Sequence, residues 1–164
     1  MTIATGEIAL ASDVNAAIAA VEEREIHIPL LYASGPATSY AENHSQLTGN
    51  ALDAAAEYMR GSFKVPNYFT TLVGARLTFV ARTTGTFDYT FTTHWGAVGE
   101  NFLNDSDSIT ADGKAIVDNV VNSIDISLAF TGIVANDSVN VCFTLDVLTT
   151  TTSVIIGYIS LWYK

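Results

Sequence analysis

The sequence contains few side chains that could act together in a reaction. His94 and Asp88 alternate onto one face of a predicted strand, but six residues of strand separate them by about 20 Å, too far for a catalytic dyad. Cys142 has no histidine or lysine beside it in the sequence that could activate its thiol. A nucleotide-binding glycine motif, a Gly-x-Ser-x-Gly motif and a Cys-x-x-Cys pair are all missing. We therefore predict that the protein is not an enzyme and uses no catalytic residue and no cofactor.

Residues 104–113 are rich in carboxylate and hydroxyl groups, which supply the oxygen ligands that calcium prefers. The candidate ligands are Asp105, Asp107 and Asp112. Their spacing departs from that of an EF-hand, because Ile109 stands where the third ligand belongs and Thr110 where the glycine belongs. We predict a solvated loop here rather than a metal site.

The histidines do not predict a zinc site either. His27, His44 and His94 are scattered along the chain and have no carboxylate or cysteine partner close in the sequence.

Four aromatic residues could form a platform for a sugar, because aromatic faces stack on pyranose rings. They are Tyr40, Tyr68, Trp95 and Trp162. Trp95 and Trp162 fall on apolar faces of predicted strands, where packing in a core or an interface is the commoner role. A carbohydrate-binding module is therefore an alternative function.

The composition restricts the partners of the protein. The formal net charge of −10 argues against binding to nucleic acid or to an anionic membrane. The single cysteine excludes an intrachain disulfide. Apolar residues make up 49% of the 164 residues, which is enough to fill the core of one domain. The N-terminus lacks the basic and apolar regions of a secretory signal, so we expect synthesis in a cytoplasm.

The N-terminal segment differs from the rest of the chain. Residues 1–10 are predicted to be an irregular tail, followed by a short helix with Ser12 or Asp13 as its N-cap. Val14 and Ile18 have helical spacing, and Ile8 and Leu10 are apolar residues of the tail. We divide the chain into an assembly or anchoring segment, residues 1–24, and a β-sandwich domain, residues 25–164.

Short strands and turn signals alternate from residue 25 to the end. Strands are predicted within residues 25–32, 76–82, 86–95, 123–130, 139–147 and 153–164, with residues 51–61 ambiguous between helix and strand and residues 96–113 forming a connection. Residues 83–85 carry a hairpin signal between two of these strands. About seven or eight strands at this spacing predict an all-β fold, an antiparallel jelly-roll β-sandwich.

The last strand is apolar on both faces. Strict alternation places Val154, Ile156, Tyr158 and Trp162 on one face and Ile155, Ile159, Leu161 and Tyr163 on the other. One face can enter the core, so the other needs cover from another subunit. The predicted interface residues are Ile155, Tyr158, Ile159, Leu161, Trp162 and Tyr163 in this strand, with Ile8, Leu10, Val14 and Ile18 in the N-terminal segment.

Spaced hydrophobic and turn positions between Phe63 and Lys164 carry a resemblance. They lie in residues 63–69, 77–81, 95–97, 137–139 and 156–163. This span resembles small jelly-roll virion structural proteins of tailed bacteriophages and related viruses, of the decoration or fibre-head type.

The resemblance implies a non-enzymatic component of a virus particle, such as a capsid decoration protein, a head or tail fibre or a tail-associated protein. It implies self-assembly, typically into a trimer, and contact with other virion proteins such as the major capsid protein. The protein would then be located in the virion. A carbohydrate-binding jelly-roll module and a subunit of a non-viral extracellular filament are the alternatives.

Overall fold

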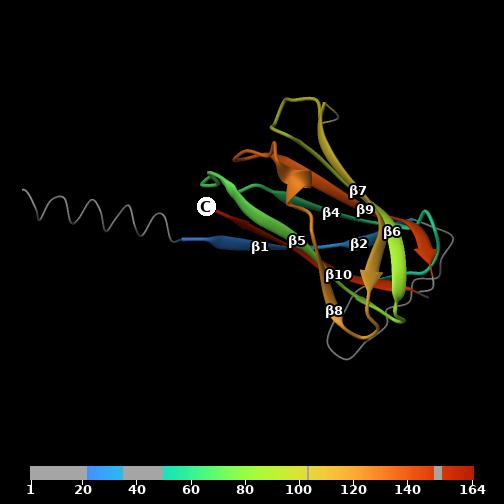
Figure 1. The fold of residues 1–164 in the computed structure, drawn as a ribbon. Coiled ribbons are helices and arrows are strands. Elements are labelled where there is room, and N and C mark those ends of the chain that lie inside the picture. The colour runs from blue at the N-terminus through green and yellow to red at the C-terminus, as the bar shows by residue number, and fades with distance from the viewer. Residues whose placement is uncertain (1–21, 35–49, 103, 150–152) are drawn as a thin grey trace, which may run out of the picture.

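The computed structural model describes residues 22–34, 50–102, 104–149 and 153–164. They form two antiparallel β-sheets that face each other across a hydrophobic core, with one short 3₁₀-helix, η1 (Ser127–Phe130). This arrangement confirms the predicted all-β jelly-roll sandwich (Figure 1).

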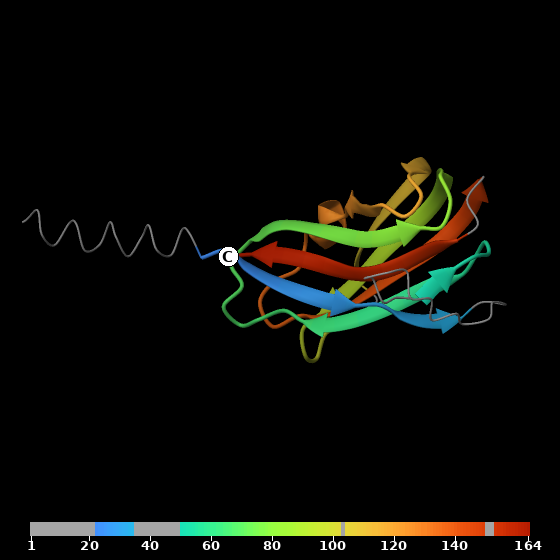
Figure 2. The same ribbon diagram turned by 90° about the horizontal axis from the view of Figure 1, so that it is seen from below.

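The first sheet has the strand order β1-β10-β5-β8. Its strands are β1 (Arg24–Pro29), β3 (Asn50–Leu52), β5 (Leu72–Ala81), β8 (Val121–Asp125) and β10 (Val154–Tyr163). Strand β10 lies between β5 on one side and β1 and β3 on the other. Figure 2 shows β10 between β1 and β5, with the C-terminus next to the start of β1.

The second sheet has the strand order β2-β4-β9-β6-β7. Its strands are β2 (Leu31–Ser34), β4 (Tyr58–Lys64), β6 (Gly85–Gly96), β7 (Asp105–Ile116) and β9 (Ser138–Thr149). The described residues thus contain ten strands, more than the seven or eight expected. One reason is that the predicted strand near residue 25 breaks after Pro29 and continues in the other sheet as β2. Proline is confined to such strand ends because it cannot donate to the ladder.

Two sequence predictions for the middle of the chain were wrong. Strands β5 and β6 do not form a hairpin, because residues 82–84 carry the chain from one sheet to the other. Phe79 of β5 and Phe87 of β6 instead meet across the core, edge to face, with ring centroids 5.5 Å apart. Most of residues 104–113 belong to β7 rather than to a solvated loop. This strand is at the edge of its sheet, so most of its side chains can be polar.

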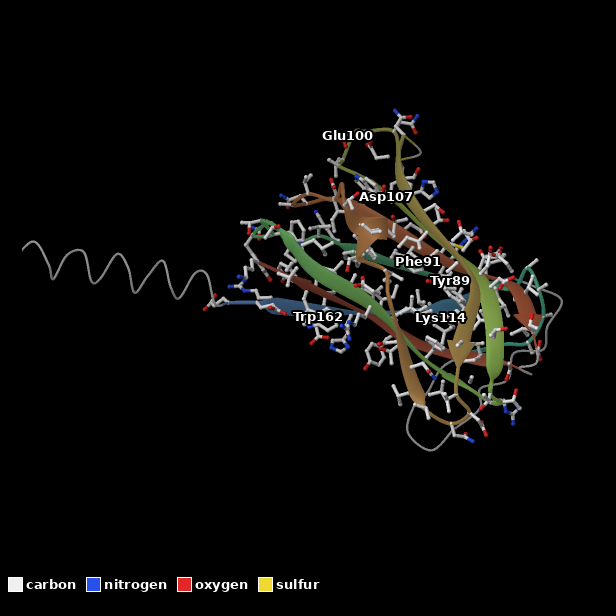
Figure 3. The ribbon with its side chains drawn as sticks, viewed as in Figure 1. Tyr89, Phe91, Glu100, Asp107, Lys114 and Trp162 are labelled. Atoms are coloured by element: carbon white, nitrogen blue, oxygen red, sulfur yellow. The ribbon has the colours of Figure 1, made fainter. Side chains whose placement is uncertain are left out.

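The core lies between the sheets and is rich in aromatic side chains. Phe87, Tyr89, Phe91 and Trp95 of β6 are buried there. Figure 3 shows Tyr89 and Phe91 between the two sheets.

A β-bulge in β10 corrects the predicted faces of the last strand. Ile156 pairs with Phe79 and Tyr158 pairs with Thr78, so Gly157 is an extra residue in β10. The bulge reverses the alternation beyond it. Val154, Ile156, Ile159, Leu161 and Tyr163 therefore all lie in the core of the domain.

The predicted interface changes accordingly. Ile159, Leu161 and Tyr163 are at most 2% exposed inside the domain, so they cannot form the surface that meets another subunit. Tyr158 and Trp162 remain on the outer face and are half-buried. The side chain of Ile155, and residues Ile8, Leu10, Val14 and Ile18 with the predicted helix, lie outside the described residues.

The described residues begin two positions before β1, so the division of the chain at residue 24 stays a prediction. Within the described ranges, no helix has the length and apolar character needed to cross a membrane.

Candidate functional site

The outer face of the first sheet carries a pocket beside Trp162. In the antiparallel pairs, Trp162 of β10 lies opposite Gly74 of β5, and Ser160 lies opposite Arg76. Arg76 in turn lies opposite Asp125 of β8. Directly opposite residues share a face of a sheet, so three strands bring an indole, a guanidinium and a carboxylate to one surface. Figure 3 shows Trp162 on the side of the first sheet that faces away from the second.

The pocket exists because Gly74 has no side chain. A Cβ atom added at Gly74 would lie 3.9 Å from Trp162 Cε3 and 3.8 Å from Ser127 Oγ, so a larger side chain would cover the indole. The hollow has a volume of about 210 Å³. It is lined by Glu23, Val73, Gly74, Ala75, Arg76, Asp125, Ser127 and Trp162.

Ser127 fixes the acidic wall of the pocket. Its hydroxyl donates to Asp125 Oδ1 at 2.6 Å, and its backbone N–H donates to the same oxygen at 2.9 Å. The hydroxyl also accepts a hydrogen bond of 2.9 Å from the backbone N–H of Ala75, which ties η1 to β5. These contacts hold the Asp125 carboxylate at the edge of the first sheet.

The charges in the pocket are available to a ligand. The hydrogen bonds from Ser127, and to a lesser extent the positive charge of Arg76, lower the pKa of Asp125 below its usual value. Asp125 is therefore an ionised acceptor at neutral pH. No described residue accepts a hydrogen bond from the Arg76 guanidinium or pairs with it within 4.0 Å. The pocket thus combines the guanidinium donors of Arg76 with an anionic acceptor, Asp125.

The other two aromatic candidates that the structure describes, Trp95 and Tyr68, have neighbours packed on their rings. Trp95 is 9% exposed, and its indole packs against the backbone at Gly132. Tyr68 is 54% exposed, but its ring lies in a stack: the Arg24 guanidinium is 4.4 Å from its centroid, and the Tyr163 ring is 6.1 Å away. Tyr40 lies outside the described residues. Trp162 is the best-placed platform among the candidates that the structure describes.

Among the acidic candidates of the sequence, Asp107 links two elements of the fold. Asp107 accepts hydrogen bonds from the N–H and the hydroxyl of Thr131, at 3.1 and 2.7 Å, and so ties the end of η1 to β7. Asp105 and Asp112 are exposed on β7. In the described part of the chain, no three His, Cys, Asp or Glu side chains gather as a metal ion would require.

The remaining polar candidates also lie apart from one another. His27 Nε2 is 3.1 Å from Glu25 Oε1 on β1, so the prediction that His27 has no carboxylate partner close in the sequence was wrong. Both residues lie at the far side of β10 from Arg76. Asp88 Oδ1 accepts a hydrogen bond of 2.7 Å from the N–H of Gly113. His94 packs near Phe102, and His44 is not described. Cys142 lies on the outer face of the second sheet, 3.8 Å from Thr144 Oγ1.

Reasoning from the sequence did not find Gly74, Arg76, Asp125 or Ser127. These residues lie 35 to 88 positions before Trp162 in the sequence, Ser127 being the nearest and Gly74 the farthest. Only the strand register brings them together. The signal that the sequence offered was the Arg76 charge in the middle of a largely apolar strand.

No protein-family model matches this sequence, and no curated protein does. Among solved structures, one similar fold is the CBM36-1 domain of a multidomain xylanase from the hindgut metagenome of Trinervitermes trinervoides. It has 8% sequence identity and a TM-score of 0.49, and the match covers 84% of this chain and 96% of that one. A second is a carbohydrate-binding module CBM36 in complex with calcium and xylotriose, with 15% identity, a TM-score of 0.46 and coverage of 84% and 98%.

A third similar structure comes from a virus. It is the enzymatically active domain of tailspike protein 4 of bacteriophage CBA120, with 10% identity and a TM-score of 0.34. The match covers 87% of this chain but 19% of the tailspike chain. All three TM-scores lie below 0.5, so these likenesses carry no argument about a ligand or an assembly.

Proposed function

We propose that this domain binds carbohydrate through the pocket at Trp162. The observation that carries the proposal is the half-exposed indole that Gly74 leaves uncovered, with Arg76 and Asp125 at its side. A pyranose ring has an apolar face of C–H groups and a rim of hydroxyl groups. The indole suits the apolar face, the guanidinium can donate to the hydroxyl groups, and the carboxylate can accept from them.

The dimensions and polarity of the pocket support a sugar rather than an apolar ligand. A hollow of about 210 Å³ is smaller than the usual site of a drug-sized molecule. Its lining contains three ionisable side chains, Glu23, Arg76 and Asp125, which would be costly to bury under an apolar ligand. Hydroxyl groups of a sugar can satisfy such side chains while one face of the ring stays on the indole.

A glycan array tests the proposal. The wild-type protein should bind a subset of glycans, and Trp162→Ala should weaken binding by about tenfold or more because the stacking surface is lost. Trp162→Phe should keep most of the binding, since a smaller aromatic face remains. Tyr58→Ala is the matched control, because Tyr58 is a half-buried aromatic residue on the second sheet.

Binding that is the same in the wild type and in Trp162→Ala would contradict the proposal. So would a wild-type protein that binds no glycan on the array.

A role in a virus particle is the second proposal. It is supported by the resemblance of residues 63–164 to jelly-roll virion proteins and by Tyr158 and Trp162, two aromatic side chains left on the outer face of β10. In this proposal the domain assembles with itself, as a trimer, and with other virion proteins such as the major capsid protein. Removing residues 1–23 should then abolish incorporation into particles while the domain stays folded; unchanged incorporation would overturn the anchoring role.

A further inference from the structure

The outer face of β10 has a second aromatic residue in line with the pocket. Tyr158 lies four residues before Trp162 on the same face, so the two positions are about 13 Å apart along the strand. Ser160 lies between them; its side chain is smaller than either ring and, at 4% exposed, is covered by its neighbours. Among the described residues, none accepts a hydrogen bond from the Tyr158 hydroxyl.

Polar side chains flank this line on both sides. On β5, Arg76 lies opposite Ser160 and Thr78 lies opposite Tyr158. On β1, His27 lies opposite Ser160. The His27 ring is tilted against the Tyr158 ring at a centroid distance of 5.1 Å, and its side chain is 58% exposed. Hydrogen-bonding groups therefore follow the whole path from one aromatic residue to the other.

We infer that the ligand is a linear oligosaccharide or polysaccharide chain that lies along β10, with one sugar on Trp162 and another on Tyr158. This inference rests on the proposed function of the Trp162 pocket. A single pyranose ring is too short to reach both aromatic residues, whereas a chain of several residues spans them. The intervening sugars pass over Ser160, where Arg76 and His27 can reach their hydroxyl groups.

The inference predicts a dependence on chain length. Calorimetric titrations would use the wild-type protein with cello-, xylo- and manno-oligosaccharides, each from the disaccharide to the hexasaccharide. In the series that binds, affinity should rise by about tenfold between the disaccharide and the pentasaccharide and then level off, because the second aromatic contact is made only by the longer chains.

Variants of Tyr158 locate the second contact. Tyr158→Ala should reduce the affinity for the hexasaccharide to that for the disaccharide and leave the disaccharide affinity unchanged. Tyr158→Phe keeps the ring and should keep most of the gain. The length series with the wild-type protein needs no variant, so the inference stays testable if Tyr158→Ala does not fold.

Two outcomes separate this inference from the proposed function. Equal affinity for all lengths, with binding still lost in Trp162→Ala, would overturn the inference and leave the pocket at Trp162 as a site for a single sugar. Absence of binding to every oligosaccharide and to the whole glycan array would overturn both.

Discussion

Gly74 and Trp162 are the pair of residues on which the candidate site depends most directly. They lie opposite each other in the β5–β10 pair, and the missing side chain at position 74 leaves the indole open to solvent. Ser127 then determines the charge beside it, because its two hydrogen bonds to Asp125 stabilise the ionised carboxylate. Gly74 therefore determines the exposure of the Trp162 indole, and Ser127 determines the position and charge of the Asp125 carboxylate.

Filling the pocket should remove binding without unfolding the domain. Gly74→Leu places a branched side chain over the Trp162 indole, and we expect at least about a tenfold loss of glycan affinity in calorimetric titration. Gly74→Ala is the matched control, because its Cβ would make ordinary contacts of 3.8 and 3.9 Å. Its affinity should stay close to that of the wild type. Full binding by a folded Gly74→Leu protein would show that the ligand does not use this pocket.

At the level of strands, sequence patterns predicted the elements better than their pairing. Strands β6 and β9 could be predicted because one face of each is apolar and the other polar. Strand β7 could not, because an edge strand rich in Asp and Ser has the composition of a loop. The bulge at Gly157 was also missed, since an extra residue in a ladder leaves no periodic signal before the partner is known.

The residues of the candidate site could likewise be predicted only in part from the sequence. Trp162 could be named as a candidate because its residue type suits a sugar ring. Arg76 and Asp125 could not, because they come from two other strands and become its neighbours through register alone. Trp95 was named for the same reason as Trp162, but it lies in the core.

The connection between η1 and β9 gives a test of the packing at the strand level. A Cβ atom at Gly132 would overlap Trp95 Cζ2 and would lie 3.2 and 3.3 Å from Cε2 and Cη2. Trp95 is buried on β6 and cannot move easily. We expect Gly132→Ala to lower the free energy of unfolding by about 1–3 kcal/mol in urea titration. Gly74→Ala, where space exists, should change it little; equal stabilities of the two variants would contradict the described packing.

At the scale of the whole molecule, glycan binding and self-assembly would compete for the outer face of β10. A glycan along β10 requires the outer face of the first sheet to be open, whereas the predicted interface would cover Tyr158 and Trp162 with another subunit. The net charge of −10 adds repulsion between copies of the chain and does not by itself favour close contact. If the domain binds glycan along β10, we expect any trimer to use another surface of the domain.

Light scattering after size-exclusion chromatography checks this expectation. The mass in solution should be the same for the wild type, Trp162→Ala and Tyr158→Ala, whatever the subunit number, because these side chains face a ligand. A wild-type oligomer that dissociates in both variants would identify the outer face of β10 as a subunit interface and would favour the virion proposal.

The most direct test of carbohydrate binding at Trp162 uses the two tryptophan indole N–H signals in a nuclear magnetic resonance spectrum of the isotope-labelled protein. Trp95 is 9% exposed in the core, so it serves as an internal reference. During titration with the cello-, xylo- and manno-oligosaccharides, we expect the Trp162 signal to shift and saturate with at least one series while the Trp95 signal stays in place. A Trp162 signal that does not move with any of them, in a protein that binds glycans on the array, would contradict the account.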